Sequence, residues 1–320
     1  MAAAPDMLTA RVTGRRTVAT GVVELELKSP NGESLPSFEP GAHIDVHLDG
    51  GLVRQYSLAN FQPDPDSYTI AIGLADASRG GSRYVHDSVA VGDELRIGLP
   101  RNSFPLAPEA EGYAFVAGGI GITPILSMVR WCEMARKPWR LLYAARSRQR
   151  AAYAEELVAL GGGRVRLHFD DETGQMADLA GFLARLRRDE HVYCCGPEPL
   201  MQVVATQTAA HPADCVHFER FSAAEAPAAG GNRPFRVRLK SSGRELQIDA
   251  GSSILDALEQ AGIDHPFACR EGLCRSCEAE VCSGLPDHRD YVLSDAEKAS
   301  NRMMMVCVSR ARDDCLELNL

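Results

Sequence analysis

The sequence predicts a multidomain protein that combines an antiparallel β-barrel, a doubly wound α/β domain and a compact C-terminal module. Three observations support this fold class. Short alternating strands fill the first hundred or so residues, strands and helices alternate from Gly112, and a segment rich in Ala, Pro and Gly precedes the C-terminal part. The 320 residues, 45% of them hydrophobic, suffice for two or three domains. The expected limits are 1–107, 108–224 and 233–320, with a linker at 225–232.

The first segment is expected to form strands because apolar and polar residues alternate along it. Glycines mark the turns between the alternating stretches, as in an antiparallel barrel. The predicted strands are Val18–Lys28, Ala42–Leu48, Ser67–Ile72 and Asp93–Ile97. Short antiparallel strands joined by frequent turns favour a barrel.

The second segment alternates between continuous apolar runs and amphipathic stretches, which is typical of a parallel sheet covered by helices. The predicted strands are Tyr113–Ala117, Arg140–Ala145, Arg164–Phe169 and His191–Cys195. The predicted helices are Thr123–Ala135, Ala151–Leu160 and Phe182–Arg188. This order indicates a doubly wound α/β domain.

The third segment is expected to begin with a hairpin, Phe235–Leu239 and Glu245–Ile248. A helix over Ser253–Ala261 follows, with Ser252 or Ser253 as its N-cap. A cysteine-rich loop and further short strands come next, one of them at Met303–Val308.

Composition narrows the choice of partners and compartment. The net charge is −9, from 34 basic and 43 acidic residues, which argues against a nucleic-acid partner. There is no apolar run of about 18 residues to span a membrane, and the start of the chain does not resemble a signal peptide. Ten cysteines in such a chain indicate metal binding or catalysis in a reducing compartment, so a cytoplasmic location is expected.

Four cysteines carry the sharpest signal. Cys269, Cys274 and Cys277 have the spacing C-x4-C-x2-C, with Cys307 further on, which is typical of plant-type [2Fe–2S] sites. Gly272 supplies some of the flexibility that a loop around a cluster needs. Structural zinc is the alternative, but zinc sites favour paired CxxC knuckles or a histidine at finger spacing. The remaining cysteines have no partner spacing: Cys132, Cys194, Cys195, Cys215, Cys282 and Cys315.

Two motifs in the barrel segment indicate a flavin. In Arg54-Gln-Tyr-Ser57, the guanidinium of Arg54 suits a phosphate, the ring of Tyr56 suits the isoalloxazine, and Ser57 can hydrogen-bond its polar edge. Gly81 and Ser82 precede a short predicted helix, whose first N–H groups suit a phosphate. A plain helix cap would explain the second motif equally well, but the two motifs together favour flavin binding.

Two further motifs indicate a dinucleotide. Gly118-Gly-Ile-Gly-Ile-Thr-Pro124 closes the first strand of the α/β segment, where a glycine turn lets a pyrophosphate approach the backbone. Cys195-Gly-Pro197 ends the fourth strand, so Cys195 is expected near the nicotinamide. Arg146 and Arg148 follow the second strand and suit either a ribose or a 2′-phosphate, which leaves NADH and NADPH open.

Together, RQYS, RGGS, GGIGITP and CGPEPL resemble the ferredoxin–NADP reductase superfamily. With the cysteine-rich module, the whole chain resembles the phthalate dioxygenase reductase family, whose layout vanillate demethylase and carnitine oxygenase reductases share. The resemblance implies an FMN-binding barrel, an NAD-binding α/β domain and a C-terminal β-grasp plant-type ferredoxin domain. It also implies FMN, NADH, a [2Fe–2S] cluster and a Rieske-type oxygenase partner.

The resemblance implies the following site residues. FMN is expected at Arg54, Tyr56, Ser57, Ala71, Ile72, Gly81, Ser82, Thr123 and Phe221. NAD is expected at Gly118, Gly119, Gly121, Arg146, Cys195, Gly196 and Pro197. The cluster is expected at Cys269, Cys274, Cys277 and Cys307.

One position departs from the family pattern. Arg275 follows the second cysteine of the motif, where the family usually has glycine. An arginine fits there if its φ is negative, and its charge would then favour the reduced cluster. The alternative is that Arg275 faces a partner protein.

The expected function follows from electron counting. NADH gives two electrons as a hydride, a [2Fe–2S] cluster accepts one, and a flavin can convert between them. The chain is therefore expected to convert a hydride into single electrons with no side-chain acid or base, and the resemblance implies that it is an NADH-dependent oxygenase reductase in aromatic compound catabolism. The alternatives are a stand-alone ferric or quinone reductase and a redox sensor or carrier.

Overall fold

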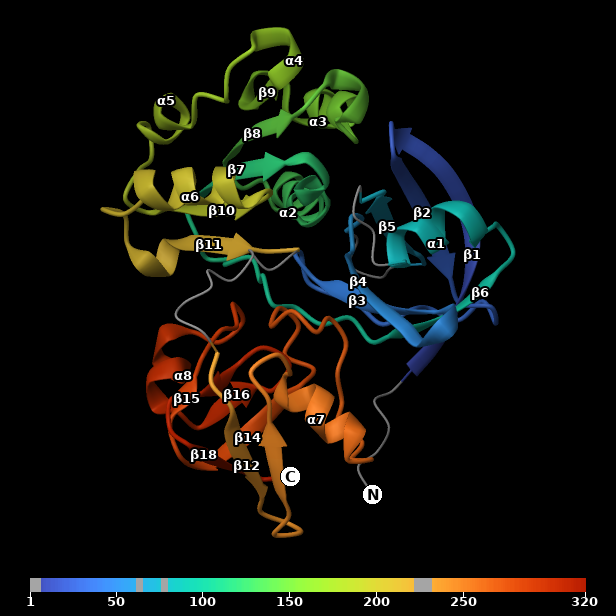
Figure 1. The fold of residues 1–320 in the computed structure, drawn as a ribbon. Coiled ribbons are helices and arrows are strands. Elements are labelled where there is room, and N and C mark those ends of the chain that lie inside the picture. Colours follow the sequence, from blue (N-terminus) through green and yellow to red (C-terminus); the bar gives the residue numbers. More distant parts are fainter. Residues whose placement is uncertain (1–6, 62–65, 76–79, 222–231) are drawn as a thin grey trace. The chain divides into compact units, whose positions relative to one another are not determined.

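The computed structural model describes residues 7–61, 66–75, 80–221 and 232–320. The chain divides into two compact units, Met1–Glu219 and Arg220–Leu320, each described here by itself (Figure 1). The predicted barrel and α/β segments thus share the first unit, and their separate limits stay a prediction. The predicted linker at 225–232 lies outside the described residues except for Asn232.

The barrel is built from one six-stranded antiparallel sheet with the order β4-β3-β6-β1-β2-β5. Its strands are β1 (Met7–Ala19), β2 (Val22–Lys28), β3 (His43–Leu48), β4 (Leu52–Ser57), β5 (Tyr68–Gly73) and β6 (Glu94–Gly98). An antiparallel bridge between Leu58 and Ile70 joins the two end strands and closes the sheet. The short helix α1 (Gly81–Ser88) packs beside β4 and β5.

One predicted strand of the barrel was wrong at its start. Val18–Lys28 was expected to be continuous, but β1 ends at Ala19 and β2 begins at Val22. Gly21 lies between them with φ +73°, a conformation that favours glycine in a tight turn. The two strands pair with each other instead of forming one element.

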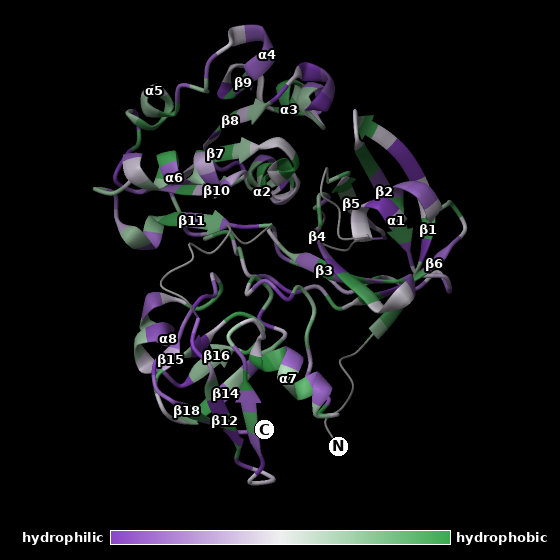
Figure 2. Cartoon of the chain, viewed as in Figure 1, coloured by the Kyte–Doolittle hydropathy of each residue, from purple (hydrophilic) through white to green (hydrophobic). Residues whose placement is uncertain are grey.

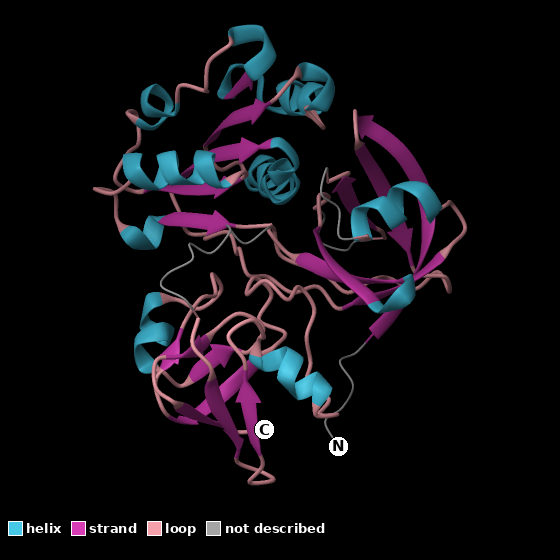
Figure 3. Cartoon of the chain, viewed as in Figure 1, coloured by secondary structure: helices cyan, strands magenta, loops and turns pink. Residues whose placement is uncertain are grey.

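The α/β part contains a five-stranded parallel sheet with the order β11-β10-β7-β8-β9. Its strands are β7 (Gly112–Gly118), β8 (Trp139–Ala145), β9 (Val165–Phe169), β10 (Glu190–Cys195) and β11 (Val216–Glu219). Its helices are α2 (Ile122–Ala135), α3 (Ala154–Gly161), α4 (Asp170–Thr173), α5 (Leu179–Leu183) and α6 (Glu198–Gln207). The predicted doubly wound fold is confirmed (Figure 3).

The two faces of this sheet bury different side chains. Tyr113 and Phe115 of β7 pack with α2 and α3, whereas Ala114 and Val116 pack with α5 and α6. Strands buried on both faces lack polar alternation, which explains the continuous apolar runs. Figure 2 shows β7 and β8 mainly in the hydrophobic colour and α4 in the hydrophilic one.

Some predicted elements of this part were displaced or missed. The helix predicted at Phe182–Arg188 is α5, which begins at Leu179 because the Asp178 carboxylate caps it by accepting from the Gly181 N–H at 2.8 Å. The helix predicted from Ala151 begins at Ala154. The short elements α4 and β11 were not predicted.

Contacts between barrel and sheet explain why they form one unit. The Tyr153 hydroxyl, at the start of α3, donates to Glu24 Oε2 of β2 at 2.7 Å. Arg130 of α2 donates to the Ala59 carbonyl at 2.8 Å. Buried hydrogen bonds of this kind would be left unsatisfied if the two parts separated.

The second unit has a mixed sheet with the order β13-β12-β18-β14-β16. Its strands are β12 (Phe235–Leu239), β13 (Glu245–Ile248), β14 (Glu278–Ser283), β16 (Met303–Met305) and β18 (Cys315–Leu318), with a smaller pair β15 (Pro286–Asp287) and β17 (Arg310–Ala311). The helices are α7 (Ile254–Gln260) and α8 (Asp295–Ser300). A hairpin, a packed helix and a parallel β12–β18 pair agree with the expected β-grasp fold.

Two details of this unit differ from or refine the prediction. Ser253, not Ser252, caps α7, and its hydroxyl accepts from the Asp256 N–H at 3.0 Å. Cys307 was expected on a strand, but β16 ends at Met305 and Cys307 lies in the following turn. Among the described helices of the whole chain, none is both long and apolar enough to cross a bilayer.

Candidate functional sites

The cysteine loop of the second unit gathers the four predicted cluster ligands. Backbone N–H groups point at the sulfur atoms: Glu271 N and Leu273 N lie 3.3 and 3.4 Å from Cys269 Sγ. The Cys269 N–H lies 3.4 Å from Cys274 Sγ. N–H groups aimed at thiolates stabilise negative sulfur, so the loop fits an iron–sulfur cluster.

The remaining two thiols complete the set. Contacts with the Cys274 and Cys307 thiols lower the pKa of Cys269, and contact with Cys307 lowers the pKa of Cys277. Cys274, Cys277 and Cys307 are buried. The four sulfur atoms therefore lie together although Cys307 is 30 residues beyond the loop.

The backbone of this loop takes left-handed conformations at three positions. Arg270, Gly272 and Arg275 have φ values of +58°, +69° and +63°. Arg275 therefore does not meet the condition of a negative φ under which an arginine would fit this position without strain. A non-glycine residue in this region costs roughly 1–2 kcal/mol, so other contacts must stabilise both arginines.

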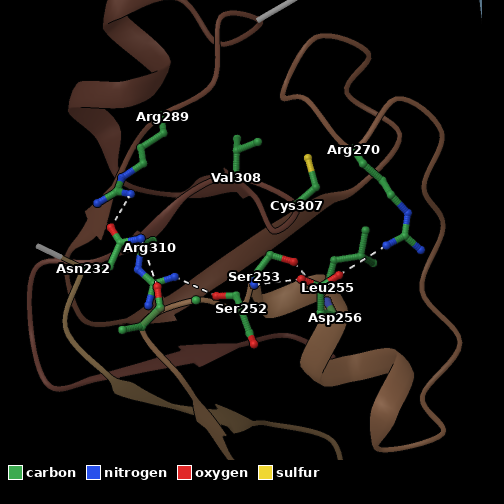
Figure 4. Close-up of a pocket in the computed structure, with 12 residues that line it drawn as sticks. Asn232, Ser252, Ser253, Leu255, Asp256, Arg270, Arg289, Cys307, Val308 and Arg310 are labelled. Atoms are coloured by element: carbon green, nitrogen blue, oxygen red, sulfur yellow. Dashed lines mark hydrogen bonds and ion pairs between the residues drawn. The ribbon is translucent and has the colours of Figure 1, made fainter. Parts of the chain in front are cut away.

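A pocket of about 280 Å³ lies beside Cys307 in the second unit (Figure 4). Three arginines line it, and each is already bonded. Arg270 pairs with Asp256, Arg289 pairs with Asp287 at 2.8 Å, and Arg310 donates to backbone carbonyls such as that of Ser252 at 2.7 Å. The pocket is therefore a polar opening next to one predicted ligand, with its cations largely neutralised.

The two predicted flavin motifs come together in the barrel. A Cβ atom on Gly81 would lie 2.5 Å from Arg54 Cγ, so the glycine lets Arg54 of β4 pass close to the start of α1. No side chain caps α1, whose N-cap is Gly80. A guanidinium beside helical N–H groups fits a phosphate, as FMN requires. Burial raises the pKa of Tyr56 to about 12, so its hydroxyl stays protonated.

The positions of the other residues predicted to contact the flavin give weaker evidence for a flavin site. Ser57 ends β4, and Ala71 and Ile72 are buried in β5. The Thr123 hydroxyl donates to the Ile120 carbonyl at 3.0 Å in the first turn of α2. Phe221 is 43% exposed and belongs to the second unit, so its contact with a flavin stays a prediction.

The two dinucleotide motifs meet where the strand order reverses. β7 and β10 are neighbours in the sheet, and each ends in one of the glycine turns. A Cβ on Gly121 would lie 2.3 Å from the Cys195 carbonyl oxygen, and a Cβ on Gly118 would lie 2.6 Å from Pro197 Cδ. The turns are thus in direct backbone contact at the topological switch point, the usual ligand position in such sheets.

Glu219 was missed in the sequence, although it lies in the same HFERF stretch as Phe221. It stands opposite Cys195 in the β10–β11 register. Burial raises the pKa of Glu219 to about 8, and its Oε2 has no hydrogen-bond partner among the described residues. Burial also raises the pKa of Cys195, so neither side chain is charged near pH 7.

Arg148 follows β8, and its positive charge is balanced by Glu172 of α4, a helix that the sequence did not predict. Arg148 Nε and Nη2 donate to Glu172 Oε1 and Oε2 at 3.1 and 3.2 Å. A guanidinium held by a carboxylate is less available to a 2′-phosphate. This geometry favours NADH over NADPH.

Comparison with known proteins identifies two of the expected domains. Residues 115–206 match the oxidoreductase NAD-binding domain, and residues 237–312 match the 2Fe-2S iron-sulfur cluster binding domain. The toluene-4-sulfonate monooxygenase system reductase subunit of Comamonas testosteroni is 44% identical over 311 residues, 97% of this chain and 98% of the relative. Tetrachlorobenzoquinone reductase of Sphingobium chlorophenolicum is 41% identical over 319 residues, 98% of each chain.

A solved structure shows the same architecture. Phthalate dioxygenase reductase, described as a modular structure for electron transfer from pyridine nucleotides to [2Fe-2S], matches with a TM-score of 0.75 and 39% identity over 98% of each chain. Fold and sites thus define a flavin- and iron–sulfur-dependent NADH oxidoreductase. The chain belongs to the phthalate dioxygenase reductase family. Its cofactors are FMN, NADH and a [2Fe–2S] cluster, as expected.

Proposed function

We propose that this chain is the NADH-dependent reductase component of a two-component Rieske-type oxygenase that acts in aromatic compound catabolism. The observation that carries the proposal is the cysteine loop, which joins four thiols within the same chain as the flavin and dinucleotide motifs. A relative that matches over almost its whole length is a monooxygenase reductase subunit. The proposed acceptor of its electrons is therefore a separate oxygenase protein.

When bound, FMN would supply the conversion between the two-electron donor NADH and the one-electron acceptor, the cluster. The chain would bind and orient these groups. Arg54 and the start of α1 would hold the FMN phosphate, and Tyr56 and Ser57 would contact the ring system. The turns at Gly121 and Cys195 admit the dinucleotide to the carboxyl edge of the sheet, and the neutral Glu219 carboxyl adds no charge there.

The proposed residue assignments follow the predicted sets. FMN is bound by Arg54, Tyr56, Ser57, Ala71, Ile72, Gly81, Ser82, Thr123 and Phe221. NADH is bound by Gly118, Gly119, Gly121, Arg146, Cys195, Gly196 and Pro197. The cluster is bound by Cys269, Cys274, Cys277 and Cys307.

The oxygenase contact is proposed to be transient, because a reductase must release its partner between successive single-electron deliveries. Glu278 is an acidic residue close to the cysteine loop, where a free carboxylate would steer that partner. Its carboxylate is instead bonded to Arg275 at 2.7 Å, so it contributes little free negative charge. A cytoplasmic location is proposed because a cysteine-rich chain that binds an iron–sulfur cluster suits a reducing compartment.

The function is tested with the purified chain under anaerobic conditions. We expect flavin and iron–sulfur absorption together, bleaching of both on addition of NADH, and a rhombic paramagnetic signal in the reduced protein. Electron delivery to a Rieske oxygenase encoded nearby should be much faster than delivery to ferric citrate. Absence of the flavin or of the paramagnetic signal would overturn the proposal.

A second candidate is a stand-alone quinone reductase, which the similarity to tetrachlorobenzoquinone reductase favours. Both functions use the same cofactors, so only the electron acceptor distinguishes one from the other. Steady-state NADH oxidation with a chlorinated benzoquinone and with an oxygenase separates them. A kcat/KM that is high for the quinone and negligible for oxygenases would favour this second candidate.

A further inference from the structure

Arg275 is the unusual residue of the cysteine loop. It follows Cys274 directly, and its φ of +63° lies in the region that favours glycine. Its side chain is 40% exposed, so burial alone does not hold it. The loop must therefore be kept in this conformation by specific contacts.

Two carboxylates supply those contacts. Arg275 Nε lies 2.7 Å from Glu278 Oε2, and Nη2 lies 3.1 Å from Glu278 Oε1. Nη2 also lies 2.6 Å from Glu297 Oε1. Glu278 begins β14 and Glu297 belongs to α8, so one guanidinium joins the loop to two other elements. We call Glu278, Arg275 and Glu297 the cluster-loop strap.

Glu297 is itself held in place. Its other oxygen, Oε2, accepts from the Ser294 N–H at 2.9 Å and so caps α8. The capping N–H of Ser294, together with Arg275, lowers the pKa of Glu297 to about 2, which keeps it ionised. The strap is therefore anchored to a helix end and not to a freely rotating side chain.

Arg270 makes a similar contact beside another proposed ligand, Cys269. It follows Cys269, has φ +58°, and pairs with Asp256 Oδ1 at 3.3 Å. Asp256 Oδ2 accepts from the Ser253 N–H at 2.9 Å and caps α7. In both cases a left-handed arginine after a ligand cysteine is bound by the carboxylate that caps a helix.

The strap also sets the charge beside the cluster. Two carboxylates and one guanidinium leave one net negative charge, so the positive charge of Arg275 is more than compensated. Loop N–H groups that point at Cys269 depend on the same backbone conformation. Hydrogen bonds to sulfur and nearby charge are the terms through which a protein tunes a cluster.

We propose that the cluster-loop strap is a positioning device that substitutes for the usual glycine, holding the loop around the cluster and setting its reduction potential. Arg275 acts through the loop backbone and through its charge, without binding iron. The inference rests on the proposed ligation by Cys269, Cys274, Cys277 and Cys307.

The experiment compares Arg275→Ala, Arg275→Gly and Arg275→Lys in the full-length protein. The rate of cluster loss to an iron chelator is followed by absorbance. Arg275→Ala should lose its cluster about tenfold faster, because the backbone cost stays and the ion pairs are gone. The rate of cluster loss from Arg275→Gly should fall between those of Arg275→Ala and the unaltered protein, because glycine removes the cost of the left-handed backbone conformation. Equal loss rates in all the proteins, or equal acceleration by Ala and Gly, would overturn the proposal.

The reduction potential provides a readout that a purely structural role would not move. In a redox titration followed by electron paramagnetic resonance, Arg275→Ala should lower the potential and Glu297→Gln should raise it. Arg275→Lys keeps the charge, so its potential should stay near that of the unaltered protein even though its cluster is lost faster. Glu280→Gln is the matched control, because Glu280 also lies on β14 but is bonded to Asn319 and not to Arg275. Its reduction potential should shift less than that of Glu297→Gln.

Shifts of the same sign in Arg275→Ala and Glu297→Gln would contradict the charge part of the proposal. Failure of the cluster assignment is distinguishable from failure of the strap. If the unaltered protein gives no rhombic signal after reduction, the ligation itself is wrong. If that signal is present and the variants match it in retention and potential, only the strap is wrong.

Discussion

At the scale of single residues, this protein depends on groups whose chemistry is altered by what surrounds them. N–H donors and neighbouring thiols make Cys269 acidic, whereas burial makes Cys195 a poor acid. Identical side chains thus serve opposite purposes. The lowered pKa suits the proposed role of Cys269 as an iron ligand, whereas the raised pKa keeps Cys195 a neutral thiol at the end of β10.

The ligand role of Cys274 is tested by Cys274→Ser. A serine hydroxyl is a poor ligand for iron, so more than about 90% of the cluster should be lost. FMN content and NADH-dependent ferricyanide reduction should stay close to normal because both depend on the first unit. Absorbance and iron content measure the result. Cys282→Ser, in the same unit, serves as the control, and a full cluster in Cys274→Ser would refute the assignment.

Glu219 makes the stability of the first unit depend on pH. Its folded pKa of about 8 exceeds the ordinary value of 4.5, so the folded state binds more protons between these pH values. The stability that the protonated Glu219 carboxyl contributes is complete below pH 4.5 and is lost as the pH rises toward 8. Between pH 6 and pH 9 the protein should lose about 2 kcal/mol more stability than Glu219→Gln. Urea unfolding followed by tryptophan fluorescence measures this difference, and parallel pH profiles would contradict it.

At the scale of elements, close backbone approach decides where ligands can enter. The turns after β7 and β10 touch at Gly121 and Cys195, and this is possible because Gly121 has no side chain. The strand order places these two turns side by side although 70 or so residues separate them. The dinucleotide site is therefore a product of the sheet topology as much as of the motif.

Gly121→Ala tests this contact. The new Cβ would lie 2.3 Å from the Cys195 carbonyl oxygen, so the two turns must move apart. We expect the KM for NADH to rise about tenfold or more while FMN stays bound. Gly163→Ala is the matched control because no atom lies within 4 Å of its new Cβ. Steady-state kinetics with ferricyanide compare the two, and equal KM values would contradict the site.

At the scale of the whole molecule, stability is divided between two units with separate cores. The barrel and the parallel sheet share buried contacts such as Tyr153 with Glu24. The core of the second unit is formed by its own residues, among them Phe235, Leu258 and Leu316. Units with independent cores are expected to unfold independently.

Calorimetry of the full chain should therefore show two unfolding transitions. Release of flavin fluorescence should accompany the transition of the first unit. Cys274→Ser should lower only the other transition, since loss of the cluster removes ligand bonds from the second unit alone. A single transition that shifts as a whole in Cys274→Ser would show that the units are energetically coupled.

Much of the fold followed from local pattern. The predicted strands matched β7, β8, β9 and β10 within a residue or two. For β7 the signal was a continuous apolar run, because a strand buried on both faces needs apolar side chains throughout. Ser253 and the hairpin of β12 and β13 were equally local signals. The short elements α4 and β11 were missed because four residues contain too little of either period to be recognised.

The functional sites also contain residues that a local pattern predicted and residues that it did not. The spacing of Cys269, Cys274 and Cys277 revealed the cluster because three ligands fall within nine residues, a distance over which sequence and space coincide. Residues that act across the fold gave no such signal. Glu219 has its raised pKa only because β11 places it opposite Cys195, and Arg275 has a positive φ only because Glu278 and Glu297 hold it.

The sequence by itself determined the order of the parts, the cofactor motifs and the four cysteines of the predicted cluster site. The tertiary structure decided which distant groups meet: Gly81 with Arg54, Gly121 with Cys195, and Cys307 with the cysteine loop. The physical reason is range. Propensity, spacing and turn chemistry act over a few residues, whereas close contact, burial and ion pairing depend on segments that only packing brings together.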